Sequence, residues 1–549
     1  MASKSKKSSA AGGSLAWAGI AVAGLGVLWA YTNGTLPFEA KPEVVFTSSG
    51  QLQGRFARGT SGVSEFLGIP YAKPPIGDLR WAPPEHLNSS AGESTLTATS
   101  FGHSCPTRMN GVAFRSTEEV TLTPHADQLM TTLLRQPGVT YSEDCLTLNV
   151  WSKQGGGDEK KAVLFWIYGG GYNTGTTNNA GYNGKYFADH EDVVVVSINY
   201  RLNIFGFPGN PHSRNNLGLL DQRLALEWVR DNIAEFGGDP DRITLFGESA
   251  GGSSVDYYTY AWTEDPIAAG FIPQSGNVFS PNSQADKDTS AKPWYTVAST
   301  LYCGDAESDQ DELLQCMRSK DWQEVQAAIP ENKGLSGVVG SFGPTIDEII
   351  VFSDYPERSA AGKVIQRPLF IGNTDNEAGL FKPTLACQNI TYTQAQWDYM
   401  AQQLFTCSTS NRAIASLINN VPTWRYRWFG DLGCLKISSV PDSGAYHGSE
   451  VAVIFGTDQD IQNQVARTKA EHEMVSYIRG AWAAFAKDPK HGLTNYGLPQ
   501  YALTEATLLR LAYNNETGSH GVLPQEYDAG CEIPEALHER LKEMAAAQE

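Results

Sequence analysis

One pentapeptide restricts the fold of this 549-residue chain more than any other feature: Gly247-Glu248-Ser249-Ala250-Gly251, the only G-x-S-x-G pattern in the sequence. It follows a short apolar run and precedes small residues that can continue as a helix. A serine on a tight turn from strand to helix crowds the residues two positions away, so glycine is needed there. Such a turn raises the hydroxyl above a sheet, and the first helical amides face any negative charge that develops nearby. The pattern favours Ser249 as a nucleophile.

The chain around this motif alternates between strand-like and helix-like patterns. Residues 162–168 and 193–200 are short apolar runs without polar alternation, which is typical of strands buried on both faces. Residues 217–228 carry leucines and a tryptophan at helical spacing, with Asp221 and Arg223 expected to face outward. Strands that alternate with helices predict an α/β fold with a mostly parallel sheet covered on both faces.

The N-terminal 43 residues differ from the rest. Residues 1–14 form a basic tail, residues 15–31 are 17 residues without a charge, and residues 32–43 form a proline-containing linker. A basic segment before such an apolar stretch is typical of a single membrane anchor or of a cleaved secretory signal peptide. In either case the lysines before the apolar stretch stay cytosolic, so we expect the rest of the chain on the lumenal or extracellular side. We expect residues 44–549 to form one large domain, because they contain no low-complexity break, charge block or repeat.

Cysteines and glycosylation motifs agree with the secretory pathway. Eight cysteines form an even number, which suits disulfides in an oxidising compartment. Four Asn-x-Ser/Thr motifs follow the apolar stretch and are predicted glycosylation sites: Asn33, Asn88, Asn389 and Asn515.

The overall composition excludes several classes of protein. The 60 acidic residues outnumber the 41 basic ones, which gives a net charge of −19 and argues against a nucleic-acid partner. The mean hydropathy of −0.31 excludes a polytopic membrane protein. Neither C-x2-C nor H-x3-H spacing occurs, so we expect no metal.

Longer motifs extend the pattern on both sides of Ser249. They lie at residues 66–72, 77–84, 143–151, 216–228 and 236–251. In this order they resemble the type-B carboxylesterase/lipase family, which includes cholinesterases and fungal lipases, over roughly residues 44–545. The resemblance implies the α/β-hydrolase fold, a single large domain with lid and loop insertions. It also implies a serine carboxylic ester hydrolase that needs no cofactor.

Three glycines follow the strand expected at residues 162–168, in the sequence Tyr168-Gly169-Gly170-Gly171-Tyr172. Without side chains, their main-chain nitrogens can approach a ligand closely. The resemblance implies that Gly170, Gly171 and the amide of Ala250 form an oxyanion hole.

A serine nucleophile needs a base, and a histidine base needs an acid that holds its tautomer. Of the five histidines after Ser249, His447 lies in a glycine-flanked loop, and Glu377 follows the strand expected at residues 367–372. The resemblance assigns His447 as the general base and Glu377 as the orienting acid, with Asp375 as the alternative acid. It also implies that Glu248 and Glu450 lie near the site and act on it electrostatically.

The resemblance further implies disulfides Cys105–Cys145 and Cys303–Cys316, the first closing a loop that lies over the active-site gorge and can act as a lid. The remaining four cysteines allow three pairings, among which the sequence does not choose: Cys387, Cys407, Cys434 and Cys531.

Several functions remain open at this stage. The acyl-enzyme could be hydrolysed by water or passed to an alcohol, and the substrate could be a small ester or a long-chain acylglycerol. A cholinesterase is disfavoured, because no tryptophan lies between Cys105 and Cys145 to supply a cation–π site. A non-catalytic adhesion or scaffold protein on the same fold is disfavoured because the serine, histidine and acid are all present. The natural ester and the oligomeric state are not predicted.

Overall fold

The structure, a computed structural model, describes residues 44–87, 95–107, 114–135, 138–153, 160–281, 283–331, 334, 340–462 and 464–546. The basic tail, the apolar stretch, the linker and the predicted glycosylation sites Asn33 and Asn88 lie outside these residues. Asn389 and Asn515 lie inside them, and both are exposed. Across the described segments, no helix combines the length and the apolar character needed to cross a bilayer.

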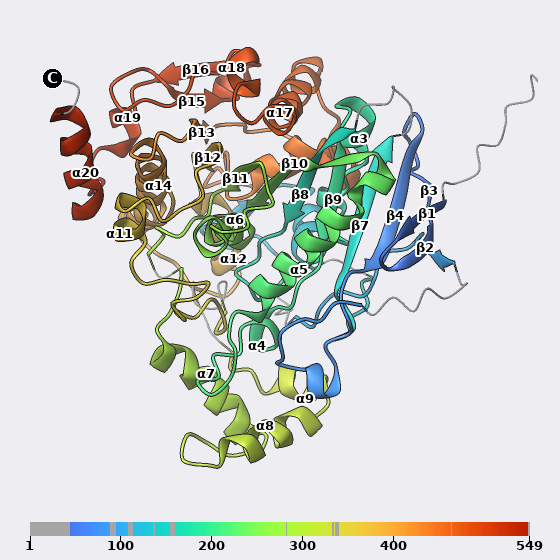
Figure 1. Cartoon of the computed structure of the whole chain (residues 1–549). Coiled ribbons are helices and arrows are strands. Elements are labelled where there is room, and N and C mark those ends of the chain that lie inside the picture. The colour runs from blue at the N-terminus through green and yellow to red at the C-terminus, as the bar shows by residue number, and fades with distance from the viewer. Residues whose placement is uncertain are drawn as a thin grey trace, which may run out of the picture. The chain divides into compact units, whose positions relative to one another are not determined.

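An eleven-stranded sheet runs through the described chain (Figure 1). The seven strands from β15 to β9 are parallel, whereas β16 at one edge and β7, β4 and β3 at the other pair antiparallel. This is the mostly parallel sheet that the alternating pattern predicts. The strands, in spatial order, are β16 (Ser519–Val522), β15 (Leu508–Leu511), β13 (Thr423–Trp428), β12 (Leu369–Thr374), β11 (Gly270–Gln274), β10 (Gly238–Glu248), β8 (Lys161–Ile167), β9 (Val194–Ile198), β7 (Thr147–Lys153), β4 (Val63–Pro70) and β3 (Arg55–Phe56).

Two small sheets accompany the large one, a three-stranded sheet near the start of the described chain and a two-stranded ladder between distant segments. They consist of β1 (Val44–Thr47), β2 (Gly50–Gln53) and β5 (Leu96–Thr97), and of β6 (Thr121–Leu122) and β14 (Ser438–Val440).

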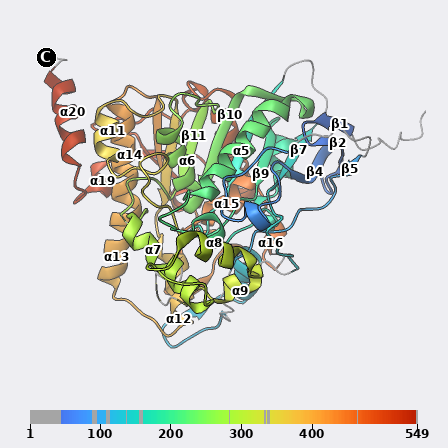
Figure 2. The ribbon, with the colours of Figure 1, turned by 60° about the horizontal axis from the view of Figure 1, so that its bottom comes forward.

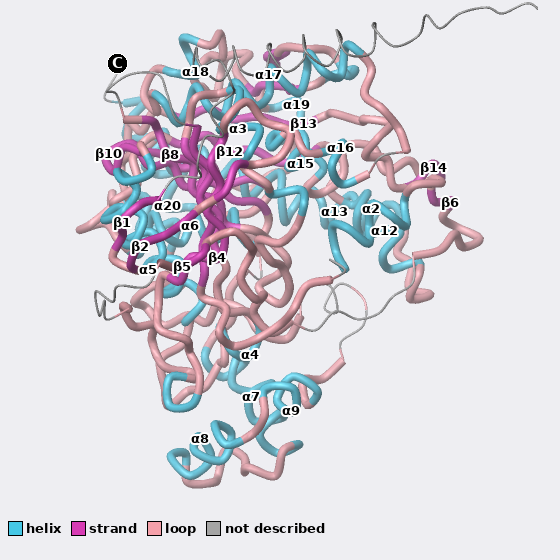
Figure 3. Tube along the Cα trace, turned by 90° about the vertical axis from the view of Figure 1, so that its right-hand side faces the viewer, coloured by secondary structure: helices cyan, strands magenta, loops and turns pink. Residues whose placement is uncertain are grey.

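Helices cover both faces of the large sheet (Figures 1 and 3). Side chains alternate along β11: Phe271 contacts Tyr258 of α6, whereas the Gln274 side chain accepts a hydrogen bond from Trp482 of α17. Helices α6 and α17 therefore lie on opposite faces. The α-helices are α2 (Ala126–Met130), α3 (Lys185–His190), α4 (Asn203–Gly206), α5 (Leu217–Asn232), α6 (Ala250–Ala261), α7 (Lys287–Thr300), α8 (Gln310–Ser319), α9 (Trp322–Ala327), α11 (Tyr355–Ala360), α12 (Ala378–Ala386), α13 (Gln394–Ala401), α14 (Ser408–Leu417), α15 (Ser449–Phe455), α16 (Asp458–Ile461), α17 (Lys469–Lys487), α18 (Gly492–Asn495), α19 (Gln525–Asp528) and α20 (Glu535–Ala546).

Short 3-10 and π-helices complete the described elements. The 3-10 helices are η1 (Gly77–Leu79), η3 (Ala180–Tyr182), η4 (Ile233–Phe236) and η6 (Tyr513–Asn515), and the π-helices are η2 (Thr131–Arg135) and η5 (Gln402–Cys407). Figure 1 shows α7, α8 and α9 close together at the bottom of the view, away from the large sheet.

Helix α5 corrects one expectation from the sequence. Asp221 does not face outward but is fully buried, where it accepts hydrogen bonds from the backbone and guanidinium of Arg201. Arg223 is also buried and donates to Tyr258 and to Asp265. The loop after β9 and helix α6 cover the side of α5 that a simple amphipathic pattern assigns to solvent, and the ion pairs satisfy the buried charges.

The structure contains the two disulfides implied by the resemblance, Cys105–Cys145 and Cys303–Cys316. It adds a third, Cys407–Cys531, which the sequence left open, and leaves Cys387 and Cys434 as free thiols. The Cys407–Cys531 disulfide connects residues 124 positions apart, so it ties the C-terminal region to the π-helix η5.

Candidate active site

Ser249 lies at the turn between β10 and α6 with a backbone φ of 58° and ψ of −123°, a conformation that L-residues rarely adopt. The flanking glycines make this turn possible. A Cβ on Gly251 would lie 2.0 Å from the carbonyl oxygen of Ile167, and one on Gly247 would lie 2.6 Å from Gly251. The Ser249 amide donates to the carbonyl of Gln274 on the next strand, which fixes the turn on the sheet.

The glycine loop after β8 lies directly against this turn. A Cβ on Gly169 would be 2.8 Å from Cβ of Ser249, and one on Gly170 would be 2.3 Å from the carbonyl of Thr174. The Gly170 carbonyl accepts hydrogen bonds from the amides of Asn173 and Thr174, which curls the loop. Gly170, Gly171 and Ala250 line the same cavity as Ser249, and among the described residues neither Gly170 nor Gly171 donates its amide to another group.

His447 and Glu377 are held together at 2.6 Å between Nδ1 and Oε2. Glu377 is fully buried, and its Oε1 accepts hydrogen bonds from the amide of Thr374 and the hydroxyl of Ser275, each at 2.8 Å. The carboxylate is therefore an acceptor for a proton on Nδ1, which leaves Nε2 free of a proton in the neutral ring. Asp375, the alternative acid, instead pairs with Arg427 at 2.7 Å, and the ion pairs of His447 in the described chain are with Glu248 and Glu377.

The other ring nitrogen of His447 faces a carboxylate instead of forming a hydrogen bond with the serine. Nε2 lies 3.1 Å from Oε1 of Glu248, and within the described chain the Ser249 hydroxyl makes no hydrogen bond to the imidazole. The ring is thus bracketed by two carboxylates. Such contacts at catalytic serines and histidines often form only when substrate is bound.

Three buried carboxyl groups influence this single imidazole, Glu248 and Glu377 in direct contact with it and Glu450 through its charge. Burial raises the pKa of Glu248 and that of Glu450 well above the usual range of a glutamate. Nearby carboxylates add to both shifts, whereas the charge of His447 opposes them. Burial alone would lower the pKa of His447, but Glu248 and Glu377 outweigh it and raise this pKa to about 9. Glu450 lies behind the site, where its Oε1 is 3.4 Å from Nε2 of Gln274.

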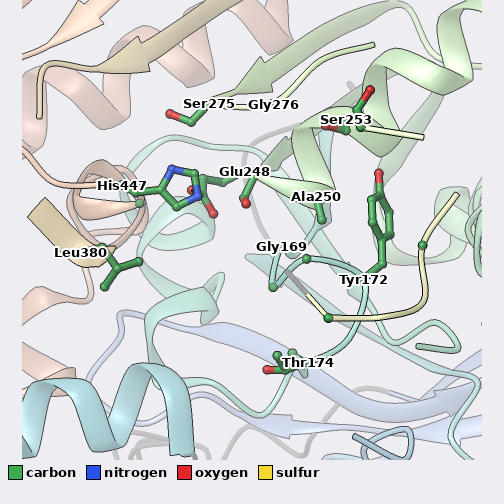
Figure 4. A pocket seen from close by; sticks show the side chains of 18 of the residues that line it. Gly169, Tyr172, Thr174, Glu248, Ala250, Ser253, Ser275, Gly276, Leu380 and His447 are labelled. Carbon is green, nitrogen blue, oxygen red and sulfur yellow. The ribbon is translucent and has the colours of Figure 1, made fainter. Parts of the chain in front are cut away.

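A cavity of about 500 Å³ opens over Ser249, and Figure 4 shows His447, Glu248, Gly169 and Ala250 arranged around it. Its walls are mainly apolar and aromatic. In the described residues, Glu248 and His447 are its only ionisable acidic or basic lining groups. Leu133 and Leu134 of η2 line it from within the loop that the Cys105–Cys145 disulfide closes. No group of His, Cys, Asp and Glu in the described chain is arranged to hold a metal ion.

Sequence reasoning missed three groups around the site. Ser275 follows β11 with a φ of 46° and donates to Glu377, and the rings of Phe381 and Phe405 lie against His447. Ser275 lies directly after β11, a strand that the sequence analysis did not identify, so the rim position that strand ends occupy in such a site was not recognised there.

A mostly parallel sheet with helices on both faces and a serine on the turn after β10 defines an α/β-hydrolase. Residues 41–400 match the family model described as "Carboxylesterase family". The chain belongs to this family of ester hydrolases, in agreement with the resemblance found in the sequence.

Similarity to individual relatives extends over most of the chain. It is 33% identical to Secreted lipase 5 of Gibberella zeae over 497 residues, which cover 86% of this chain and 90% of that protein. It is 32% identical to chlorogenic acid esterase of Aspergillus niger over 458 residues, 82% of this chain and 83% of the relative. The cholinesterase of Mus musculus is 35% identical over 349 residues, 62% of this chain and 54% of that protein.

Proposed function

We propose that this carboxylesterase-family protein hydrolyses uncharged carboxylic esters through an acyl-enzyme on Ser249. The observation that carries the proposal is the Glu377–His447 pair, 2.6 Å apart, which faces the cavity that Ser249 and the glycine loop also line. Base, nucleophile and amide donors thus surround one space large enough for a small-molecule ester.

The reaction begins when Oγ of Ser249 attacks the ester carbonyl carbon and Nε2 of His447 accepts its proton. The amides of Gly170, Gly171 and Ala250 donate to the oxyanion that forms, and each such donor is worth about 2.7–4 kcal/mol of transition-state stabilisation. His447 then gives the proton to the departing alcohol oxygen as the C–O bond breaks. Water, deprotonated by His447, attacks the acyl-enzyme, and the proton returns to Ser249 as the acid leaves.

Glu248 holds the imidazole in its resting position in this mechanism. Because Nε2 lies against Glu248 in the absence of substrate, the ring must turn toward Ser249 for the first proton transfer. The negative charge of Glu248 also favours the protonated form of the His447 ring. Before the reaction this effect is unfavourable, because a protonated ring cannot act as a base. After the proton transfer from Ser249 the same charge stabilises the imidazolium.

Replacing Glu248 with glutamine tests this role. The change keeps the size of the side chain and removes the charge that raises the pKa of His447, so the neutral base exists at lower pH. We expect the acid limb of kcat/KM against pH to move to lower pH by about one unit. Glu85→Gln, at an exposed residue paired with Lys73, is the control and keeps the midpoint. An unchanged or higher midpoint in Glu248→Gln would contradict the role.

The lining of the cavity supports uncharged substrates. Among the described residues no lysine or arginine lines it, and Glu248, its one carboxylate, would repel an anion, so a negatively charged acyl chain would be buried without a partner. We expect p-nitrophenyl hexanoate to be cleaved with a kcat/KM at least about tenfold above that of mono-p-nitrophenyl adipate, which differs by a terminal carboxylate. Equal rates, or a preference for the adipate, would refute this assignment.

A lipase acting on long-chain acylglycerols, or an enzyme that transfers the acyl group to an alcohol, uses the same chemistry. One relative is named a lipase and another an esterase of chlorogenic acid, so the comparisons favour neither class. Comparing the hydrolysis rate of emulsified trioleoylglycerol with that of soluble short-chain esters distinguishes a lipase from an esterase. Product analysis with added alcohol separates the second.

We further propose that the enzyme enters the secretory pathway, with residues 44–549 as its catalytic domain on the lumenal or extracellular side. Three disulfides and a relative named as secreted support this location. Residues 15–31 serve as anchor or signal, and Asn33, Asn88, Asn389 and Asn515 are the proposed glycosylation sites. N-terminal sequencing of the mature chain distinguishes anchor from signal.

A further inference from the structure

Two phenylalanine rings lie close to the imidazole of His447. The ring centroids of Phe381 and Phe405 are each 5.1 Å from that of His447, with interplanar angles of 36° and 55°. Phe381 follows the acid Glu377 by four residues on α12, so one short segment supplies both contacts. Phe405 comes from a different part of the chain, the π-helix η5.

The Phe405 side chain lines the cavity and is not part of the hydrophobic core formed by the described residues. It is half-buried, lines the cavity over Ser249, and belongs to none of the hydrophobic clusters formed by the described residues. The helix that carries it is a π-helix, a geometry that is rare in proteins and found frequently at functional sites. The contact of Phe405 that bears on the reaction is therefore the one with the imidazole of His447, the proposed base.

The C-terminal region fastens this π-helix at both of its ends. We call residues 525–531 the C-terminal strap. At the last residue of η5, the Cys407–Cys531 disulfide joins it to the strap. At the first residue, Nε2 of the Gln402 side chain donates to the carbonyl of Tyr527 at 3.1 Å. Figure 2 shows α19, which contains part of the strap, beside α13 and α14, the helices on either side of η5.

Two arginines of β13 fix the strap and the π-helix to the sheet. Arg425 is 1% exposed and forms an ion pair with Asp528 of the strap. Arg427 donates to the hydroxyl of Thr406 in η5 at 3.0 Å, and its guanidinium lies 4.6 Å from the ring of Tyr527. The same Arg427 pairs with Asp375 in the loop that carries Glu377, so the acid and Phe405 are tied to one strand.

From these contacts we infer that Phe405 is a positioning residue for His447, and that the C-terminal strap holds Phe405 in place through the Cys407–Cys531 disulfide. The inference rests on the proposed function of His447. In that function the imidazole turns between Glu248 and Ser249, and the two neighbouring rings restrict the orientations that it can take during this turn. Without Phe405 the imidazole would reach orientations in which Nε2 faces neither group, so fewer encounters with Ser249 would be productive.

Kinetics of Phe405 variants test the inference. We expect Phe405→Ala to lower kcat on p-nitrophenyl butyrate by between about 10- and 100-fold, with KM changed less than about threefold. The second-order rate of labelling by a neutral fluorophosphonate should fall in parallel, while the final labelled fraction stays complete. Phe405→Tyr, which keeps the ring, should restore most of kcat. If Phe405→Ala raised KM and left kcat unchanged, the ring would serve only to bind substrate. If it changed neither constant, the ring would have no role in the reaction. Either result would overturn the inference.

A disulfide variant tests the role of the strap. It also provides an independent test of the inference if Phe405→Ala fails to fold. Replacing Cys407 and Cys531 with alanine together should lower kcat in the same direction as Phe405→Ala. Combining the changes should add little, since both remove one restraint on the same ring. The control replaces Cys303 and Cys316 with alanine and should keep kcat within about twofold. Fully additive losses, or an equal loss in the control, would overturn the role of the strap.

These experiments separate the inference from the proposed function. If the parent enzyme showed no turnover that depends on Ser249, the proposed function itself would be wrong. Normal Ser249-dependent turnover together with an unaffected Phe405→Ala variant would remove only the inference.

Discussion

Replacement of Ser249 by alanine is expected to lower kcat/KM for p-nitrophenyl esters by about 10⁴- to 10⁶-fold, with KM and thermal stability little changed. The reason is local: Ser249 supplies the oxygen that forms the acyl-enzyme, and no second hydroxyl occupies the tip of the turn after β10. The residual rate would come from the amide donors and from substrate binding. Initial rates under substrate excess, with protein concentration fixed by absorbance, measure the effect.

Ser319→Ala is the matched control for this experiment. Ser319 ends helix α8, is exposed and bonds only the nearby carbonyl of Cys316, so its loss should leave the rate unchanged. A Ser249→Ala enzyme that retains a tenth or more of the parental rate would contradict the assignment of the nucleophile.

The second large effect is expected from Glu377→Gln, a loss of about 10³- to 10⁴-fold in kcat. The Thr374 amide and the Ser275 hydroxyl both donate to Oε1. The carbonyl oxygen of the new glutamine must therefore take that position, which turns its NH₂ group toward Nδ1 of His447. Nδ1 becomes an acceptor, the proton moves to Nε2, and the ring can no longer accept a proton from Ser249.

Asp375→Asn provides the comparison, because this neighbouring carboxylate pairs with Arg427 instead of the imidazole. We expect a loss of less than about tenfold, through a looser loop. If Asp375→Asn were more damaging than Glu377→Gln, the acid would be wrongly assigned. Circular dichroism and the Tm of both variants show whether the fold is retained.

Parts of the site that depend on local backbone geometry could be predicted from the sequence. Gly247 and Gly251 are required wherever a serine sits on a strand-to-helix turn, so the pentapeptide indicates the turn and the nucleophile together. The buried strands were equally readable, because residues 162–168 and 193–200 lack polar alternation and correspond to β8 and β9 with shifts of one or two residues at their ends. His447 and Glu377 were found through the family resemblance and their loops.

Features that depend on packing between distant segments could not be predicted. Asp221 lies on the predicted polar side of its helix, yet Arg201 from another loop covers it. The four remaining cysteines allowed three complete pairings, and only the tertiary path of the C-terminal region brings Cys407 to Cys531 and leaves Cys387 and Cys434 free. The resemblance implied that Glu248 lies near the site, but the approach of its carboxylate to Nε2, like that of Phe405 to the imidazole, depends on tertiary packing.

Covalent labelling tests the central claim most directly. Incubation of the full chain with a neutral fluorophosphonate, followed by peptide mass spectrometry, reports which side chain acts as the nucleophile. The mechanism predicts one adduct per molecule, on Ser249, formed in proportion to the loss of esterase activity and blocked by excess ester. An adduct on another residue, or full loss of activity with Ser249 unmodified, would contradict it.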